Sequence, residues 1–206
     1  HKYIHAFPLD ISNEQKTQAT ISNIETKLGQ IDLAILNAGT HESMSVENFS
    51  TKKFRLLVET NLMGTVYGLA YLIKLFLARK GGKIVIVSSI AGYRGLPTSS
   101  AYGATKAALI NMCEALKPEL HAHNIYLALV NPGFVKTPLT DKNDFNMPFL
   151  ISAEEAAIQI LKGINRRQFE ISFPFFFSLI MKILRIVPDG LYFFLTRQLT
   201  HNEQKK

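Results

Sequence analysis

The sequence predicts an α/β protein built on a doubly wound parallel sheet, with helices on both faces. Short apolar runs of strand length alternate with longer segments of helical composition along the chain. Two of these runs end in the turn-forming tripeptides Asn37-Ala38-Gly39 and Asn131-Pro132-Gly133, as expected where a parallel strand leads back toward its next helix. With 206 residues and 47% hydrophobic content, the chain is expected to form one domain with a sizeable core.

The first half of the chain supplies four expected elements. Residues 3–9 are predicted as a strand that ends at Asp10. Ser12 is the expected N-cap of a helix, with Gln15 as its capping-box partner and Gly29 as its C-terminal stop. Next come a strand over residues 31–36 and a long helix over about 51–79.

The second half continues the alternation. Gly81-Gly82 breaks the long helix before the next strand, and Ser152 with Glu155 forms a capping box that opens a later helix. The expected strands cover residues 83–87, 125–130 and 168–173, and the expected helices cover residues 100–121 and 152–162. Residues 174–199 form a Phe-rich and Leu-rich helical extension, so we place the main domain at 1–173 and a hydrophobic, basic tail at 174–206.

Charge and cysteine content exclude several classes of function. The net charge is +7, and five of these charges fall after residue 161, where eight basic residues stand against three acidic ones. No stacking platform or recognition motif accompanies this charge, so a nucleic-acid role is not expected. Cys113 is the only cysteine, and the histidines show no ligand spacing, so neither a disulfide framework nor a metal site is predicted.

Tyr102 and Lys106 carry the strongest chemical signal. Four residues apart in an Ala-rich segment, they lie on the same face of a helix. An ammonium beside a phenol favours the phenolate and is expected to lower the pKa of Tyr102. The hydroxyl of Ser89 could bind the substrate oxygen that Tyr102 protonates or deprotonates, which suits interconversion of an alcohol and a carbonyl.

Further motifs follow in a fixed order. Asn61 lies 24 residues beyond Asn37, Ser89 lies 28 beyond Asn61, and Tyr102 lies 13 beyond Ser89. Together with the segment from Asn131 to Thr137, these motifs resemble the short-chain dehydrogenase/reductase family over residues 3–140 or so. The resemblance implies a Rossmann-like fold and an NAD(P)-dependent oxidoreductase.

The resemblance also implies residue roles. Tyr102 would be the general acid/base, and Lys106 would lower its pKa and bind the nicotinamide ribose. Ser89 would hold the substrate oxygen, with Ser88 as the alternative, and Asn61 would hold a water for a proton relay or remain a buried structural amide. Cofactor contacts are implied for Asp10, Asn37, Ala38, Gly39, Pro132, Gly133, Val135 and Thr137, in addition to Tyr102 and Lys106. The choice between NAD and NADP stays open.

One part of the family pattern is missing from the printed sequence. The resemblance implies a Gly-rich phosphate loop, T-G-x-x-x-G-x-G, and this sequence contains none. We therefore expect a family member without its first two strands, and an inactive fragment stays an open alternative. An epimerase with the same Tyr and Lys is disfavoured by Asn61 and by the Asn37-Ala38-Gly39 turn.

Substrate and partners are predicted more coarsely. Together with the Phe-rich tail, apolar residues after Thr137 favour an apolar small-molecule substrate such as a lipid-like ketone or alcohol: Phe145, Met147, Pro148, Phe149 and Leu150. The tail over 174–199 suits either peripheral membrane contact, a lid over the pocket or a subunit interface. We expect a cytoplasmic protein, with peripheral membrane attachment left open, and the resemblance implies a homo-oligomer through the helices at 51–79 and 100–121.

Overall fold

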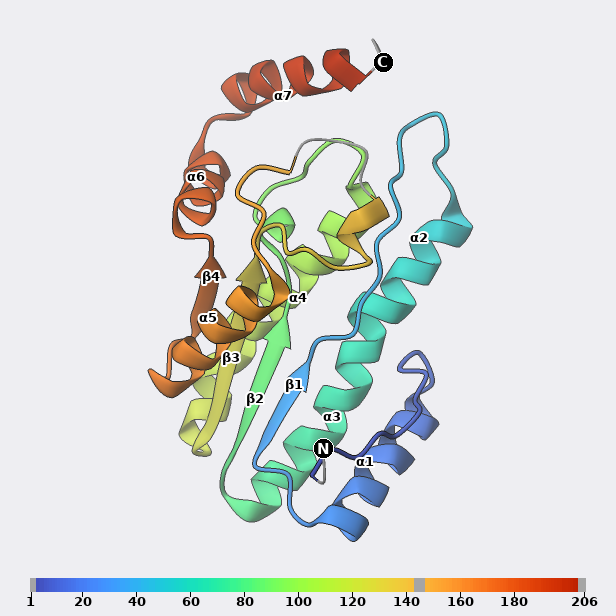
Figure 1. Ribbon diagram of the computed structural model, residues 1–206, viewed down its shortest axis with the longest axis vertical. Helices are drawn as coiled ribbons and strands as arrows, with labels where there is room; N and C mark the ends of the chain where they lie inside the picture. Colours follow the sequence, from blue (N-terminus) through green and yellow to red (C-terminus); the bar gives the residue numbers. More distant parts are fainter. Residues whose placement is uncertain (1–2, 143–146, 204–206) are drawn as a thin grey trace.

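A four-stranded parallel sheet forms the centre of the computed structural model, which describes residues 3–142 and 147–203 (Figure 1). The strands lie in the order of the chain: β1 (Leu33–Leu36), β2 (Gly82–Val87), β3 (Ile125–Pro132) and β4 (Glu170–Phe173). The helices are α1 (Glu14–Leu28), α2 (Thr51–Leu57), α3 (Gly64–Arg79), α4 (Ser100–Ala122), α5 (Ala153–Asn165), α6 (Phe175–Ile186) and α7 (Asp189–Glu203). The predicted parallel α/β class is confirmed.

Alternation along the strands divides the core into two layers. Ile84 and Ile86 of β2 face the same side as Leu127 and Leu129 of β3, and they pack with residues of α3 and α4. The residues between them, such as Val85 and Ala128, face the opposite side and pack against α5. Both strands are therefore apolar on both faces, as expected for the centre of a parallel sheet.

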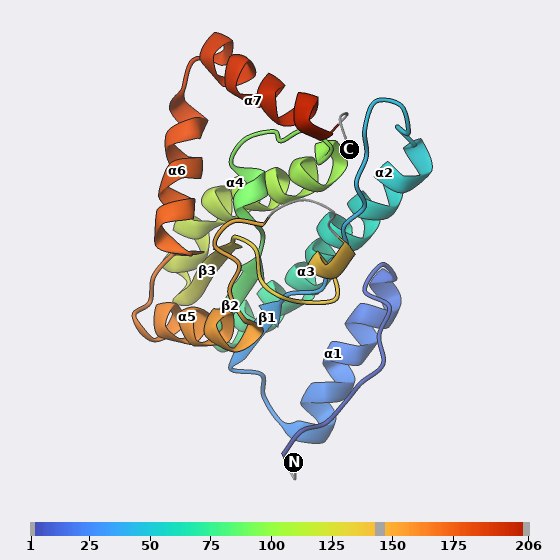
Figure 2. The same cartoon turned by 45° about the horizontal axis from the view of Figure 1, so that its top comes forward.

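The two faces are covered unequally (Figures 1 and 2). Helices α3 and α4 lie along one face, while α5 covers the other face beside β3 and β4. Over β1 the α5 face stays open, and the side chain of Ile35 is 45% exposed. This opening becomes one side of the cavity described below.

The predicted long helix over 51–79 is confirmed, with one irregular stretch. Residues Val58–Met63 form a π-helical segment between α2 and α3. By length and composition, Thr51–Arg79 is the single candidate membrane span within the described ranges. However, its residues Leu72 and Phe76 are fully buried in the core against the sheet, as in the core helix of a folded domain.

The predicted strand over residues 3–9 is wrong. This segment forms no strand and instead runs beside α1, with Tyr3 87% exposed (Figure 2). A strand is stabilised by hydrogen bonds to a neighbouring strand, and β1 pairs within the described sheet with β2 alone. The apolar composition of residues 3–9 suits a strand, but composition does not show whether a neighbouring strand is present to pair with it.

The predicted N-cap Ser12 is also wrong, by one residue. The carboxylate of Asp10 accepts both the backbone N–H and the hydroxyl of Ser12, at 3.0 and 2.7 Å. The side chain of Asn13 therefore caps α1 and accepts the N–H of Lys16 at 2.8 Å. The C-terminal stop at Gly29 and the capping box of Ser152 with Glu155 are confirmed.

The predicted helical extension after residue 173 is confirmed as α6 and α7. Met181 of α6 belongs to the main core, so this helix packs on the domain rather than standing apart from it. Arg94 holds the junction between the two helices: it donates to the carbonyls of Leu184, Arg185 and Val187 at 2.7–3.1 Å and pairs with Asp189 at 2.6 Å. The domain boundary at residue 173 and the homo-oligomer stay predictions. Phe145 and the last two lysines lie outside the described residues.

Replacing Arg94 with Met should loosen the junction of α6 and α7. The change removes the donor that satisfies three helix-terminal carbonyls, with an expected loss of about 1–3 kcal/mol in the free energy of unfolding. Amide hydrogen exchange in residues 189–197 should accelerate by about tenfold or more. Arg185→Met is the control, since its guanidinium lies 3.9 Å from Glu114 in an exposed pair. Equal exchange in both variants would contradict the anchoring role of Arg94.

Candidate active site

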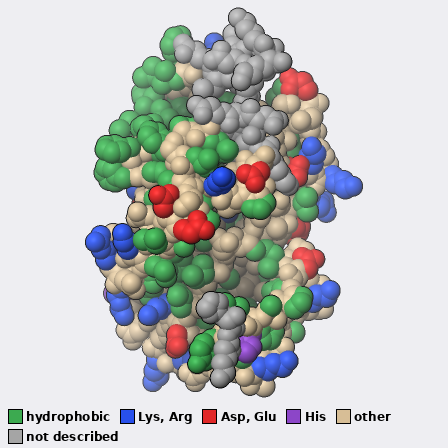
Figure 3. Space-filling view, in the orientation of Figure 1, with side chains coloured by type: hydrophobic (Ala, Val, Ile, Leu, Met, Phe, Trp, Pro, Cys, Tyr) green, Lys and Arg blue, Asp and Glu red, His purple; other side chains and the backbone are tan. Residues whose placement is uncertain are grey.

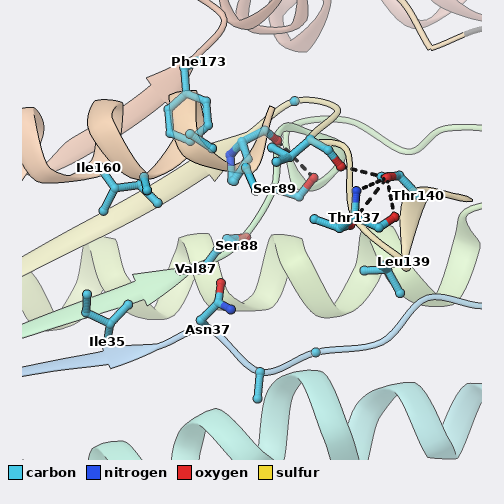
Figure 4. A pocket seen from close by; sticks show the side chains of 18 of the residues that line it. Ile35, Asn37, Val87, Ser88, Ser89, Thr137, Leu139, Thr140, Ile160 and Phe173 are labelled. Carbon is cyan, nitrogen blue, oxygen red and sulfur yellow. Dashed lines mark hydrogen bonds between the residues drawn. The ribbon is translucent and has the colours of Figure 1, made fainter. Parts of the chain in front are cut away.

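A cavity of about 800 Å³ lies at the carboxyl ends of β1, β2 and β3 (Figure 4). Its floor consists of the turns that follow these strands, and α5 supplies the opposite wall, where Ile160 faces Ile35 across the opening. Ligands of open parallel sheets bind at this edge, where strand ends diverge into their loops. The lining includes the predicted residues Asn37, Ala38, Gly39, Ser88, Ser89, Tyr102, Lys106, Pro132, Gly133, Val135 and Thr137.

Tyr102 and Lys106 enter this cavity from the first two turns of α4. Because they are four residues apart, both side chains leave the same face of the helix. The ammonium of Lys106 lies 5.7 Å from the ring centroid of Tyr102 and donates to the carbonyl of Val87 at 3.0 Å. The imidazole of His41 packs edge-on against the phenol ring, with 4.8 Å between ring centroids.

The electrostatics of this pair differ from the sequence prediction. Burial raises the pKa of Tyr102, and the hydroxyl of Ser89 offsets this only in part. Burial also lowers the pKa of Lys106 to about 8. The expected fall in the pKa of Tyr102 is therefore absent here, because removal from water outweighs an ammonium that contacts a backbone carbonyl rather than the phenol oxygen.

The two serines have separate contacts. Ser89 caps a short 3₁₀ turn by accepting the N–H of Ala91 at 3.1 Å, and its hydroxyl lies 3.4 Å from the carbonyl of Pro132. Ser88 donates to the carbonyl of Lys106 at 2.8 Å and so ties the end of β2 to α4. This contact gives Ser88 a structural role, and the phenol-facing serine is Ser89, as the spacing predicts.

Asn61 supports the floor of the cavity from below. Its side chain accepts the N–H of Thr40 at 2.7 Å and donates to the carbonyl of Thr40 at 2.8 Å. It also donates to the hydroxyl of Thr105 at 3.3 Å. The π-helical segment places Asn61 here, fully buried, and its contacts are those of a satisfied structural amide. The water relay stays a prediction.

Close packing explains the glycine beside this amide. A Cβ on Gly39 would lie 3.2 Å from Oδ1 of Asn61 and 3.7 Å from Nζ of Lys106. A side chain here would occupy space beside the ammonium. The backbone of Asn37, Ala38 and Gly39 therefore forms a shallow floor that admits a flat ligand close to Lys106.

The segment after β3 is held by a threonine that sequence reasoning missed. Thr140 accepts the N–H of Thr137 at 2.9 Å, and its hydroxyl lies 2.7 Å from the carbonyl of Val135 (Figure 4). A Thr three residues after Thr137 is a signal for such a side-chain turn. The wall formed by α5, including Ile160 and Leu161, was also missed, because its position depends on the tertiary structure.

Asp10 lies apart from the other predicted site residues. It is exposed in the turn before α1 and is absent from the cavity lining. Hydrogen bonds from the side chain and backbone of Ser12 hold the pKa of Asp10 below its usual value. The structure thus brings together ten of the twelve residues named for catalysis and cofactor binding around one cavity, with Asn61 just below its floor, and leaves Asp10 outside.

Comparison with known proteins decides the family. The family model described as short chain dehydrogenase matches residues 1–147. The chain belongs to the short-chain dehydrogenase family. It is an oxidoreductase of this kind, and the fold and family predicted from the sequence are confirmed.

Individual relatives agree with this assignment. An uncharacterized oxidoreductase of Myxococcus xanthus is 33% identical over 184 residues, covering 89% of this chain and 73% of that protein. A short-chain dehydrogenase of Streptomyces avermitilis shares the fold at 21% identity, with a TM-score of 0.78 over 98% of this chain and 80% of that one. The structure of ElxO with NADP bound is 27% identical, with a TM-score of 0.70 over 81% of this chain and 75% of that one.

The low pKa of Lys106 should appear in the pH dependence of stability. Between its folded pKa of about 8 and its ordinary value of 10.5, the unfolded chain holds more protons than the folded one, so stability rises with pH. Relative to Lys106→Met, the unmodified chain should gain ~3 kcal/mol between pH 7 and pH 10.5, measured by urea unfolding. Lys162→Met, at an exposed position on α5, is the control. A pH-independent difference for Lys106→Met would contradict the buried-ammonium assignment.

The amide of Asn61 should be essential for the floor of the cavity. Asn61→Leu keeps a similar volume but leaves the N–H and the carbonyl of Thr40 without their buried partner, at an expected cost of about 2–4 kcal/mol. Urea unfolding of this variant measures that cost. Asn48→Leu is the control, because Asn48 accepts a single backbone N–H in an exposed loop. A loss no larger than that of the control would contradict the supporting role.

Proposed function

We propose that this chain interconverts an alcohol and a ketone or aldehyde, with NAD or NADP as the hydride carrier. The observation that carries the proposal is that Tyr102, Ser89 and Lys106 share one cavity with the small-residue floor of Asn37, Ala38 and Gly39. A phenol, a hydroxyl and an ammonium at the same ligand site form an acid/base set suited to a carbonyl oxygen.

Ser89, Tyr102 and Lys106 have separate proposed roles at that oxygen. Ser89 holds the substrate oxygen by hydrogen bonding, and Tyr102 donates a proton to it during reduction or removes the hydroxyl proton during oxidation. When bound, the nicotinamide supplies the hydride in one direction and accepts it in the other. Lys106 contributes positive charge beside the phenol, and ligand contacts that draw its ammonium toward Tyr102 favour the phenolate.

The cavity offers groups suited to the ribose and the nicotinamide of a dinucleotide. The flat backbone at Ala38 and Gly39 permits close approach of a ribose, and the ammonium of Lys106 can donate to the ribose hydroxyls. Pro132, Gly133, Val135 and Thr137 are assigned to the nicotinamide end, where backbone groups and the hydroxyl of Thr137 suit a carboxamide. ElxO, a relative by structure and sequence, is known with NADP bound, and either NAD or NADP is proposed here.

The substrate side of the cavity is apolar. Leu139, Ile160 and Phe173 lie among the lining residues (Figure 4). Outside the cavity lining, Phe177 of α6 lies against Gly133, and its ring stacks on Phe134 and Phe149 at 5.6 and 5.8 Å between ring centroids. We propose an apolar alcohol or ketone, such as a lipid-like one, as substrate. Turnover of small polar sugars alone, in a panel that also contains aliphatic ketones, would overturn this assignment.

A second candidate is a chain that keeps the acid/base residues but does not bind the cofactor by itself. The observation that favours it is the lack of a Gly-rich phosphate loop in the printed sequence. Fluorescence titration with NADH and NADPH separates the two candidates. Saturable binding supports the enzyme, and no binding by a folded chain supports the inactive candidate.

Tyr102→Phe tests the proposed acid/base directly. Loss of the phenol oxygen should lower kcat for ketone reduction by about 100-fold to 10,000-fold, while the cofactor still binds. Tyr3→Phe is the matched control, since Tyr3 is 87% exposed and remote from the cavity. Equal activity of Tyr102→Phe and the unmodified chain would overturn the assignment of Tyr102.

A further inference from the structure

Helix α6 exposes an apolar face to solvent while its other face packs on the domain. The buried side consists of Ser178 and Met181, with Phe177 and Leu184 partly buried beside them. The residues on the solvent side recur at helical spacing and are 43–81% exposed: Phe175, Phe176, Leu179, Ile180, Ile183 and Ile186. A helix at the surface of a domain ordinarily presents polar residues to solvent. An apolar face of this size is typical of a site that binds another surface.

The exposed face continues onto α7. Leu191, Phe193, Phe194 and Leu195 are 42–60% exposed, whereas Tyr192 between them is buried and donates to the carbonyl of Gly95. Figure 3 shows hydrophobic side chains gathered at the end of the molecule that carries α6. We call these ten residues of α6 and α7 the tail patch. They lie on two consecutive helices at one end of the protein (Figure 1).

Basic residues lie beside the tail patch. On α6, Lys182 and Arg185 lie at one edge of the apolar stripe, with side chains that are 45% and 52% exposed; Lys182 pairs with Glu170, and Arg185 lies 3.9 Å from Glu114. Arg197 follows on α7 and is also exposed. The acidic Asp189 between the helices pairs with Arg94. Over residues 174–197 the sequence carries three basic residues and one acidic residue, so the two tail helices have a net positive charge.

We propose that the tail patch docks the protein on the surface of an anionic phospholipid bilayer. Apolar side chains on one face and basic side chains at its edge match the acyl chains and the negative headgroups of such a surface. A second copy of the chain is the rival occupant. However, the cores of interfaces between protein subunits are depleted in lysine, and a positive patch facing its own copy is repelled.

The placement of α6 relates the patch to the active site. Phe177, on the domain side of this helix, lies against Gly133, where an added Cβ would be 3.0 Å from its ring. Gly133 also lines the cavity, so one helix separates the cavity wall from the proposed bilayer surface. Delivery of an apolar substrate from the bilayer follows if the proposed function holds, whereas docking itself does not depend on it.

Flotation of the full-length chain with vesicles tests the docking. Vesicles of equal parts phosphatidylcholine and phosphatidylglycerol should carry the protein upward through a density gradient, and vesicles of phosphatidylcholine alone should carry less. The variant Phe176→Ser, Ile180→Ser, Ile183→Ser should reduce binding to the anionic vesicles by about tenfold or more. Flotation separates bound protein from aggregates, which sink.

A matched variant controls for general loss of exposed apolar surface. Leu28→Ser, Val46→Ser, Phe49→Ser changes three residues that are 48–87% exposed and lie outside the tail patch, and it should bind as the unmodified chain does. Equal binding by both triple variants, or no flotation of the unmodified chain, would overturn the proposal. A dimer in solution that the α6 variant converts to a monomer, without vesicle binding by either, would assign the patch to self-association instead. Circular dichroism confirms that each variant is folded.

Discussion

Two hydrogen bonds between α4 and the end of β2 fix the geometry on which the site depends. The ammonium of Lys106 donates to the carbonyl of Val87, and the hydroxyl of Ser88 donates to the carbonyl of Lys106. These paired contacts hold the first turns of α4 against the central strands, and Tyr102 takes its place from that position. The charge is buried at a cost, which is visible in the lowered pKa of Lys106. Such a cost is tolerated where a buried charge serves ligand binding or chemistry.

Most of the sheet and its helices could be predicted because each element carries a local signal. The continuous apolar run of β2, the turn after β1 and the capping box of α5 all depend on neighbouring residues in the sequence. Residues 3–9 failed this approach, since a strand exists only through its partner and composition does not name one. The N-cap prediction at Ser12 was wrong for a more local reason. The N–H and the hydroxyl of Ser12 are both bound by the carboxylate of Asp10, and the side chain of Asn13 caps α1 instead.

The candidate active site could also be predicted only in part. The spacing of the motifs was enough to predict that Tyr102, Lys106 and Ser89 lie around one cavity. Ser89 follows the end of β2, and Tyr102 and Lys106 share one face of α4. The direction of the pKa shift of Tyr102 could not be obtained this way, since it depends on burial and on where the ammonium of Lys106 finds its acceptor. The wall of α5 and the support from Asn61 likewise depend on tertiary placement and on a π-helical segment that sequence patterns do not reveal.

The segment between Ser89 and Tyr102 joins the site to the tail. Tyr93 and Lys182 both donate to the carboxylate of Glu170, which also accepts from Asn131 at 3.0 Å. Although burial alone would raise it, these hydrogen bonds, led by that of Lys182, hold the pKa of Glu170 below its usual value. One carboxylate thus connects the segment after Ser89, the strand before Pro132 and helix α6. Arg94, in the same segment, holds the end of this helix through the carbonyls of Leu184 and Val187. The helix that carries most of the tail patch is therefore held to the segment after Ser89 by two separate sets of polar contacts, one at Glu170 and one at Arg94.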